Sequence, residues 1–178
     1  MEMQEIIDLA LECGFSHAGP MDTSTLVFRD EVRAMCAADK CNAYGKNWAC
    51  PPGCGTVEEC AEMVRKYKRG VIVQTTGELE DSMDYEAFSE IAAQQKAHFH
   101  KFSKALRERL SGILVVGDSH CDRCKKCTYP DAPCRFPEER SSSMEALGLV
   151  VSEVCQKNNI PYYYGPGTLT YVGMVLID

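Results

Sequence analysis

Clustered cysteines are the feature of this sequence that most constrains its fold. The chain has 11 cysteines among 178 residues, and most of them lie in two short windows. The first window contains Cys36, Cys41, Cys50 and Cys54, and the second contains Cys121, Cys124, Cys127 and Cys134. So high a cysteine density is typical of disulfide-bonded domains, which are much shorter than this chain. An odd number of thiols cannot all form disulfides. Each window supplies four thiols, which is the number that one metal site needs, so two metal sites are favoured over disulfides.

The second window has the spacing Cys-x2-Cys-x2-Cys-x6-Cys. This spacing is close to the ferredoxin pattern Cys-x2-Cys-x2-Cys-x3-Cys-Pro, in which thiolates bind [4Fe-4S] clusters. Two-residue gaps let the backbone wrap one face of the inorganic core. Structural zinc also takes four thiolates, usually from two Cys-x2-Cys pairs about 12 to 20 residues apart. The window therefore predicts an iron-sulfur cluster, with structural zinc as the alternative.

The first window, Cys-x4-Cys-x8-Cys-x3-Cys, predicts a second [4Fe-4S] cluster held by Cys36, Cys41, Cys50 and Cys54. Cys54 is the weakest of these candidate ligands, because Pro51 and Pro52 stiffen the backbone before it and can turn its thiol away. A site with only three thiolates would leave one iron open to a substrate atom. Whether Cys54 is a ligand therefore decides between a cluster that only transfers electrons and a cluster that binds a substrate.

Three cysteines lie outside the windows, on or beside predicted apolar helical faces: Cys13, Cys60 and Cys155. A cysteine in such a position usually acts as a small buried hydrophobic residue. We expect these thiols to pack in the core and not to bind metal.

Basic side chains alternate with the ligands of the second window, at Arg123, Lys125, Lys126 and Arg135. They could offset the negative charge of thiolates and sulfides, or bind an acidic redox partner protein. An ordinary solvated loop would have the same composition, so both interpretations stay open.

Alternating strand and helix patterns predict an α/β fold, with a mixed central sheet flanked by helices in a single iron-sulfur-binding domain over residues 1–178. Strands are expected near Phe15, Val71, Ile113, Tyr162 and Tyr171, the last two forming a C-terminal β-hairpin. Helices are expected over residues 6–13, 23–35, 56–69, 84–110 and 142–157. Capping boxes at Thr56 and Ser142 support two of these helix starts.

Charge and hydropathy exclude several classes of function. The net charge of −7 argues against a surface that binds nucleic acid. No segment approaches the roughly 18 apolar residues of a membrane span, and the acidic first residues do not resemble an export signal. We therefore expect a cytoplasmic protein that interacts with neither nucleic acid nor membranes.

The two motifs in combination resemble a known family. Its members are the predicted metal-binding proteins catalogued as domain of unknown function 2284, which are similar to this chain over Cys36–Pro52 and Cys121–Gly148. The resemblance implies metal at both windows and an iron-sulfur protein of bacteria and archaea, largely anaerobes. The resemblance also implies that Cys36, Cys41 and Cys50 match the family's first motif better than Cys54 does.

Taken together, the spacings predict a protein that binds two [4Fe-4S] clusters and transfers electrons to a redox partner protein in anaerobic metabolism. Two alternatives remain: a redox enzyme whose open-iron cluster acts on a small-molecule substrate, and a structural zinc protein.

Overall fold

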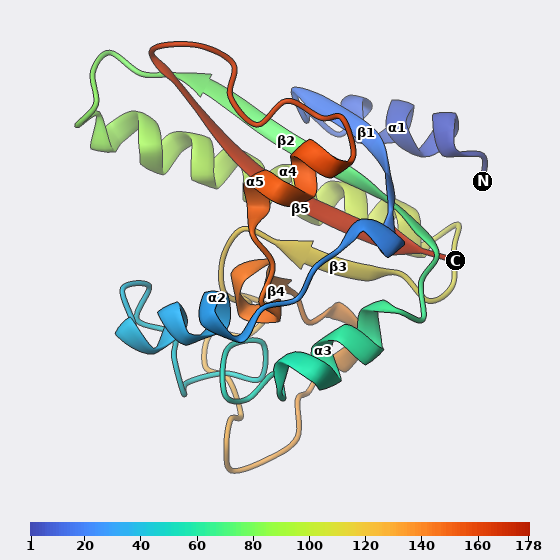
Figure 1. Cartoon of the computed structure of the whole chain (residues 1–178), viewed down its shortest axis with the longest axis vertical. Coiled ribbons are helices and arrows are strands. Elements are labelled where there is room, and N and C mark those ends of the chain that lie inside the picture. The colour runs from blue at the N-terminus through green and yellow to red at the C-terminus, as the bar shows by residue number, and fades with distance from the viewer.

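A five-stranded mixed sheet organises the chain in the computed structural model, which describes residues 1–178 (Figure 1). The strands are β1 His17–Asp22, β2 Arg69–Glu78, β3 Leu114–Gly117, β4 Ser142–Ser143 and β5 Thr168–Ile177. Their order across the sheet is β1-β2-β5-β3-β4, with β3 and β4 parallel and every other pair antiparallel. The predicted α/β class with a mixed sheet is confirmed.

Side-chain alternation along the central strands separates two hydrophobic cores. Val71 and Val73 of β2 point into one core, whereas Ile72 between them points into the other. On β5, Val175 points into the first of these cores and Met174 points into the second. Both faces of these strands are apolar because helices cover both sides of the sheet.

The helices are α1 Met3–Glu12, α2 Asp30–Ala34, α3 Val57–Val64, α4 Tyr85–Arg107 and α5 Val151–Lys157. Helices α1 and α4 pack on the first core, and α3 and α5 pack on the second. No helix of the chain has the length and apolar character needed to cross a membrane. The sheet is therefore the middle of three layers. The first cysteine window lies between α2 and α3, and the second lies between β3 and β4.

Several local predictions are confirmed. Thr56 caps α3 through a capping box in which its hydroxyl accepts from the amide of Glu59 at 3.1 Å. Gly14 follows the end of α1 with a φ of 114°, a backbone conformation that favours glycine. The three isolated cysteines are buried, with Cys13 in the first core and Cys60 and Cys155 in the second.

The helix predicted from Ser142 to Lys157 is wrong in its first half. Ser142 and Ser143 form β4 beside β3, because their backbone pairs with Val116 and Gly117. A short 3-10 turn over Glu145–Leu147 follows, and the chain then reverses at a left-handed glycine, so that α5 begins only at Val151. Tertiary pairing with a strand far away in the sequence has overridden a local capping pattern.

The helix predicted over residues 23–35 is also shorter than expected. Its α-helical part is α2 alone, preceded by a 3-10 turn over Thr23–Thr25 and an extended segment. The amide of Arg29 donates to the carbonyl of Gly148 at 2.8 Å, which holds this segment against a distant part of the chain.

The predicted C-terminal hairpin is wrong, because only its second arm is a strand. Residues near Tyr162 form no strand, and the β5 backbone pairs with β2 and β3 instead. The buried side chain of Gln74 holds the first arm, donating to the Pro161 carbonyl at 2.8 Å and accepting from the Tyr164 hydroxyl at 2.6 Å.

Candidate metal centre

The first cysteine loop folds around a buried asparagine. Asn47 is only 7% exposed, and its side chain accepts from the amide of Ala49 at 2.9 Å and donates to the carbonyl of Ala43 at 3.2 Å. The amide of Gly45 donates to the carbonyl of Pro51 at 2.8 Å across the loop. These bonds satisfy the polar backbone of a segment without helix or strand.

Three cysteines of the first window line one cavity of about 270 Å³. They are Cys36, Cys41 and Cys50, which are half-buried, exposed and buried respectively. The polar side chains around them are Lys40, Tyr44, Asp118, Ser119, His120, Ser143 and Glu145. Asp118 to His120 directly follow β3 and precede Cys121. The end of this strand therefore places one wall of the cavity beside the start of the second window.

The electrostatics of this cavity oppose free thiolates. Burial raises the pKa of Cys50, the Asn47 hydrogen bond partly opposes this effect, and negative charge on Cys41, Cys36 and Cys121 raises the pKa further. Burial, followed by the charges of Glu145 and Cys41, raises the pKa of Cys36. Thiolates that repel one another are stabilised by a metal cation, so this set of thiols is suited to metal binding.

Cys54 lies in a different environment. Its sulfur accepts from the guanidinium of Arg33 at 3.1 Å, and its thiol donates to the carbonyl of Ala146 at 3.7 Å. The thiol of Cys60 donates to the Cys54 carbonyl at 3.4 Å, and Arg33 also reaches the Cys60 sulfur and the Gly55 carbonyl. Hydrogen bonding to Cys60, followed by burial, raises the pKa of Cys54 well above its usual range.

The structure thus brings together three cysteines of the first window and places the fourth beside Cys60. The hydrogen bond to Cys54, followed by the Arg33 charge, lowers the pKa of Cys60 to about 7 against the effect of its burial. Cys60 had been expected only to fill the core, and its contact with Arg33 was not predicted. The two side chains are far apart in sequence, so no local pattern could have indicated this contact.

The second cysteine loop is irregular and partly exposed. Its cysteines Cys121, Cys124, Cys127 and Cys134 are all half-buried. The Thr128 hydroxyl donates to the Pro133 carbonyl at 2.8 Å, and the Ala132 amide donates to the Thr128 carbonyl at 3.0 Å, which turns the chain between the third and fourth cysteines.

The two cysteine loops lie against each other at one end of the molecule (Figure 1). The indole of Trp48 donates to the carbonyl of Ala132 at 3.0 Å, and its ring packs edge-on against Tyr129 with centroids 4.9 Å apart. Arg140, which follows the second loop, donates to the Trp48 carbonyl at 3.2 Å. A single tryptophan of the first loop therefore contacts the second loop through its ring and the segment after that loop through its backbone.

A single-ion site is not formed by these side chains. Nowhere in the chain do three or more His, Cys, Asp or Glu side chains converge in an arrangement that would hold one metal ion. In a [4Fe-4S] cluster each thiolate binds a different iron, so the sulfurs are farther apart than around one ion.

Comparison with known proteins supports metal binding. A model of the predicted metal-binding protein family DUF2284 matches residues 20–177, which is most of the chain. The chain belongs to this family. No curated protein and no solved structure matches it. Membership in DUF2284 and the two groups of clustered thiols therefore agree on metal binding, and the predicted family resemblance is confirmed.

Proposed function

We propose that this DUF2284 protein is an iron-sulfur redox protein that binds two [4Fe-4S] clusters, one at each cysteine window, and transfers electrons between them. The contact between the two loops supports this proposal most directly. Trp48 packs on the second loop, and Cys121 is close enough to Cys50 to affect its pKa. Clusters bound in these loops would be neighbours, as electron transfer between them requires.

The arrangement of the thiols favours iron-sulfur clusters over structural zinc. A zinc ion needs four ligands at about 2.0 to 2.3 Å around one point. The cavity shared by Cys36, Cys41 and Cys50 has a volume of about 270 Å³, and its thiols line the walls without converging. A multi-iron core fits such a cavity better than one ion does.

A redox partner protein would bind at the second loop, and an acidic partner surface is the better match. Lys125 and Lys126 are exposed between the cysteines and form no ion pair. Arg123 is bound to Glu139 at 2.6 Å, and Arg135 donates to a backbone carbonyl of the loop. The two lysines are therefore the free charges that can attract a partner.

Metal analysis of anaerobically purified protein tests the proposal. Two clusters predict about eight irons and eight sulfides per chain, together with the visible absorption of thiolate-ligated iron. About four irons would support one cluster only. Zinc without sulfide in a colourless protein would contradict the proposal and support the structural zinc alternative.

The position of Cys54 favours a second candidate, a redox enzyme whose first cluster has an open iron. Substitution of Cys54 by Ala is expected to leave the iron and sulfide content unchanged, because its sulfur contacts Arg33 outside the thiol cavity. Substitution of Cys50 by Ala is expected to remove the iron of the first site, about four per chain. Cys13→Ala serves as the matched control, since Cys13 is a core residue far from both windows in sequence.

If Cys54→Ala loses the first cluster while Cys13→Ala keeps it, Cys54 is a ligand. In that case both clusters have four thiolates, and electron transfer alone is the better interpretation.

A further inference from the structure

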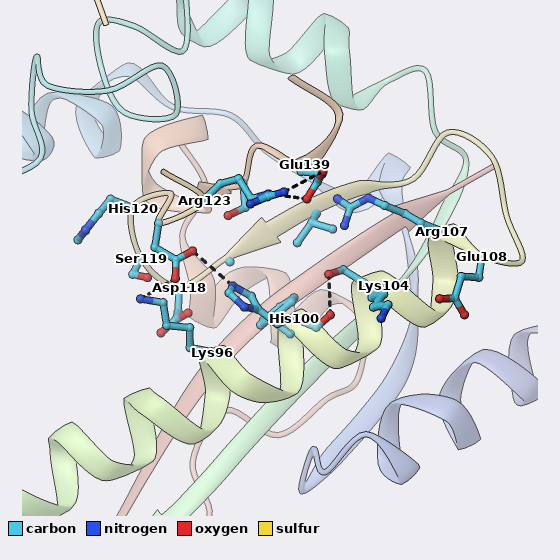
Figure 2. A pocket seen from close by; sticks show the side chains of 16 residues that line it. Lys96, His100, Lys104, Arg107, Glu108, Asp118, Ser119, His120, Arg123 and Glu139 are labelled. Carbon is cyan, nitrogen blue, oxygen red and sulfur yellow. Dashed lines mark hydrogen bonds and ion pairs between the residues drawn. The ribbon is translucent and has the colours of Figure 1, made fainter. Parts of the chain in front are cut away.

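A second and larger cavity lies between α4 and β3, with the start of the second cysteine window above it (Figure 2). Its volume of about 590 Å³ lies within the range of small-molecule binding sites, about 300 to 1,000 Å³. Only two of its 16 lining residues are hydrophobic, so the cavity suits a polar ligand.

One face of α4 supplies a line of basic side chains to this cavity. Lys96, His100, Lys104 and Arg107 all line it, and their spacing of four, four and three residues places them on the same side of a helix. Figure 2 shows Lys96 at one end of the line and Arg107 at the other, with the cavity above them.

The carboxylates of the cavity form ion pairs with only one end of this line. Asp122 binds Lys96 at 2.7 Å and lies 3.4 Å from His100. Lys104 and Arg107 form no ion pair, and Arg107 donates only to the backbone carbonyl of Glu138, at 3.0 Å. Burial lowers the pKa of Arg107, against a smaller opposing effect from the charges of Glu139 and Glu138, which lie near it without forming an ion pair.

We propose that this cavity binds a small organic anion, whose phosphate or carboxylate group lies between Lys104 and Arg107. A guanidinium and an ammonium group about one helical turn apart can each give charge-assisted hydrogen bonds to such an oxyanion. The rest of the cavity extends away from this pair along the α4 face, toward the hydroxyl of Ser119 and the carboxyl of Asp118, and gives the body of the ligand a polar environment.

The far end of this cavity adjoins the thiol cavity. Asp118, Ser119 and His120 line both cavities. A ligand that extends along α4 as far as Asp118, Ser119 or His120 would lie at the wall shared with the thiol cavity, where a redox centre at its cysteines could act on it. That last step rests on the proposed function, whereas binding of the anion does not depend on metal at the cysteines.

Calorimetric titration of the full-length, anaerobically purified chain tests the inference, with inorganic phosphate and citrate as separate probes at constant ionic strength. We expect at least one probe to bind, and the double variant Lys104→Gln/Arg107→Gln to weaken that binding by about tenfold or more. Binding of phosphate alone identifies a phosphate-bearing ligand, and binding of citrate alone identifies a carboxylate.

The matched control is Lys101→Gln/Arg109→Gln, which removes the same charge from residues that do not line the cavity. Lys101 is on α4 but donates to the Glu12 carbonyl of α1 at 2.9 Å, on another side of the helix. The inference is overturned if neither probe binds the unaltered chain at millimolar concentration, or if Lys104→Gln/Arg107→Gln weakens binding no more than the control. Iron content is measured on the same samples, so that anion binding without iron would contradict the proposed function and leave this inference intact.

Discussion

Gly173 shows how tightly individual residues are constrained where α4 crosses the sheet. A Cβ atom at this position of β5 would overlap the ring of Phe99 and lie 3.0 Å from the Val116 carbonyl. Gly173→Ala is therefore expected to destabilise the protein by about 1 to 3 kcal/mol, since overpacking forces neighbouring groups to shift. Chemical denaturation measures this change in the free energy of unfolding.

Gly117→Ala is the control for this prediction, because the nearest atom to its added Cβ is 4.0 Å away. The double variant Gly173→Ala/Phe99→Leu is expected to be less destabilised than the sum of its single variants, because the smaller side chain removes the overlap. Equal destabilisation by the two glycine variants would show that the Phe99 contact does not limit the packing.

At the scale of elements, the start of α3 fixes the end of the first cysteine loop. Thr56 caps this helix through its hydroxyl, directly after Gly55. Thr56→Ala is expected to lower the free energy of unfolding by about 1 kcal/mol, whereas Thr56→Ser, which keeps the hydroxyl, is expected to lower it much less. Thermal or denaturant unfolding of the two variants checks this, and equal losses would contradict a capping role.

At the scale of the whole molecule, Trp48 joins the two cysteine loops. Trp48→Ala removes both its hydrogen bond to Ala132 and its ring contact with Tyr129. We expect faster hydrogen exchange of the backbone amides in residues 128–134, because the second loop loses its contact with the first. Exchange in β2 and β5 is expected to stay unchanged, since these strands are paired on both sides.

The exposed Tyr163 provides the control aromatic truncation, as Tyr163→Ala removes a ring that packs on neither loop. If Trp48→Ala leaves exchange in residues 128–134 at the rate seen with Tyr163→Ala, the loops are held together by other contacts.

Local chemistry explains which predictions from sequence succeeded. The capping box at Thr56 and the apolar run of β2 depend on residues a few positions apart, so the elements they predict are present in the structure. The capping pattern at Ser142 failed because β3, a strand some 25 residues earlier in the chain, pairs with its backbone. The basic residues of α4 recur in the sequence at intervals of three or four, which indicates one helical face. The cavity above that face cannot be inferred from the sequence.

The sequence by itself determined that this chain forms an α/β fold and carries thiols grouped for metal binding, because periodicity and cysteine spacing are local properties of the chain. Only the tertiary structure decided which thiols share a cavity. Cys54 lies four residues from Cys50, yet its sulfur accepts from Arg33 and does not line the cavity of Cys36 and Cys41. The contact between Trp48 and Ala132, and the cavity between α4 and β3, likewise depend on how separate layers pack, which no short segment encodes.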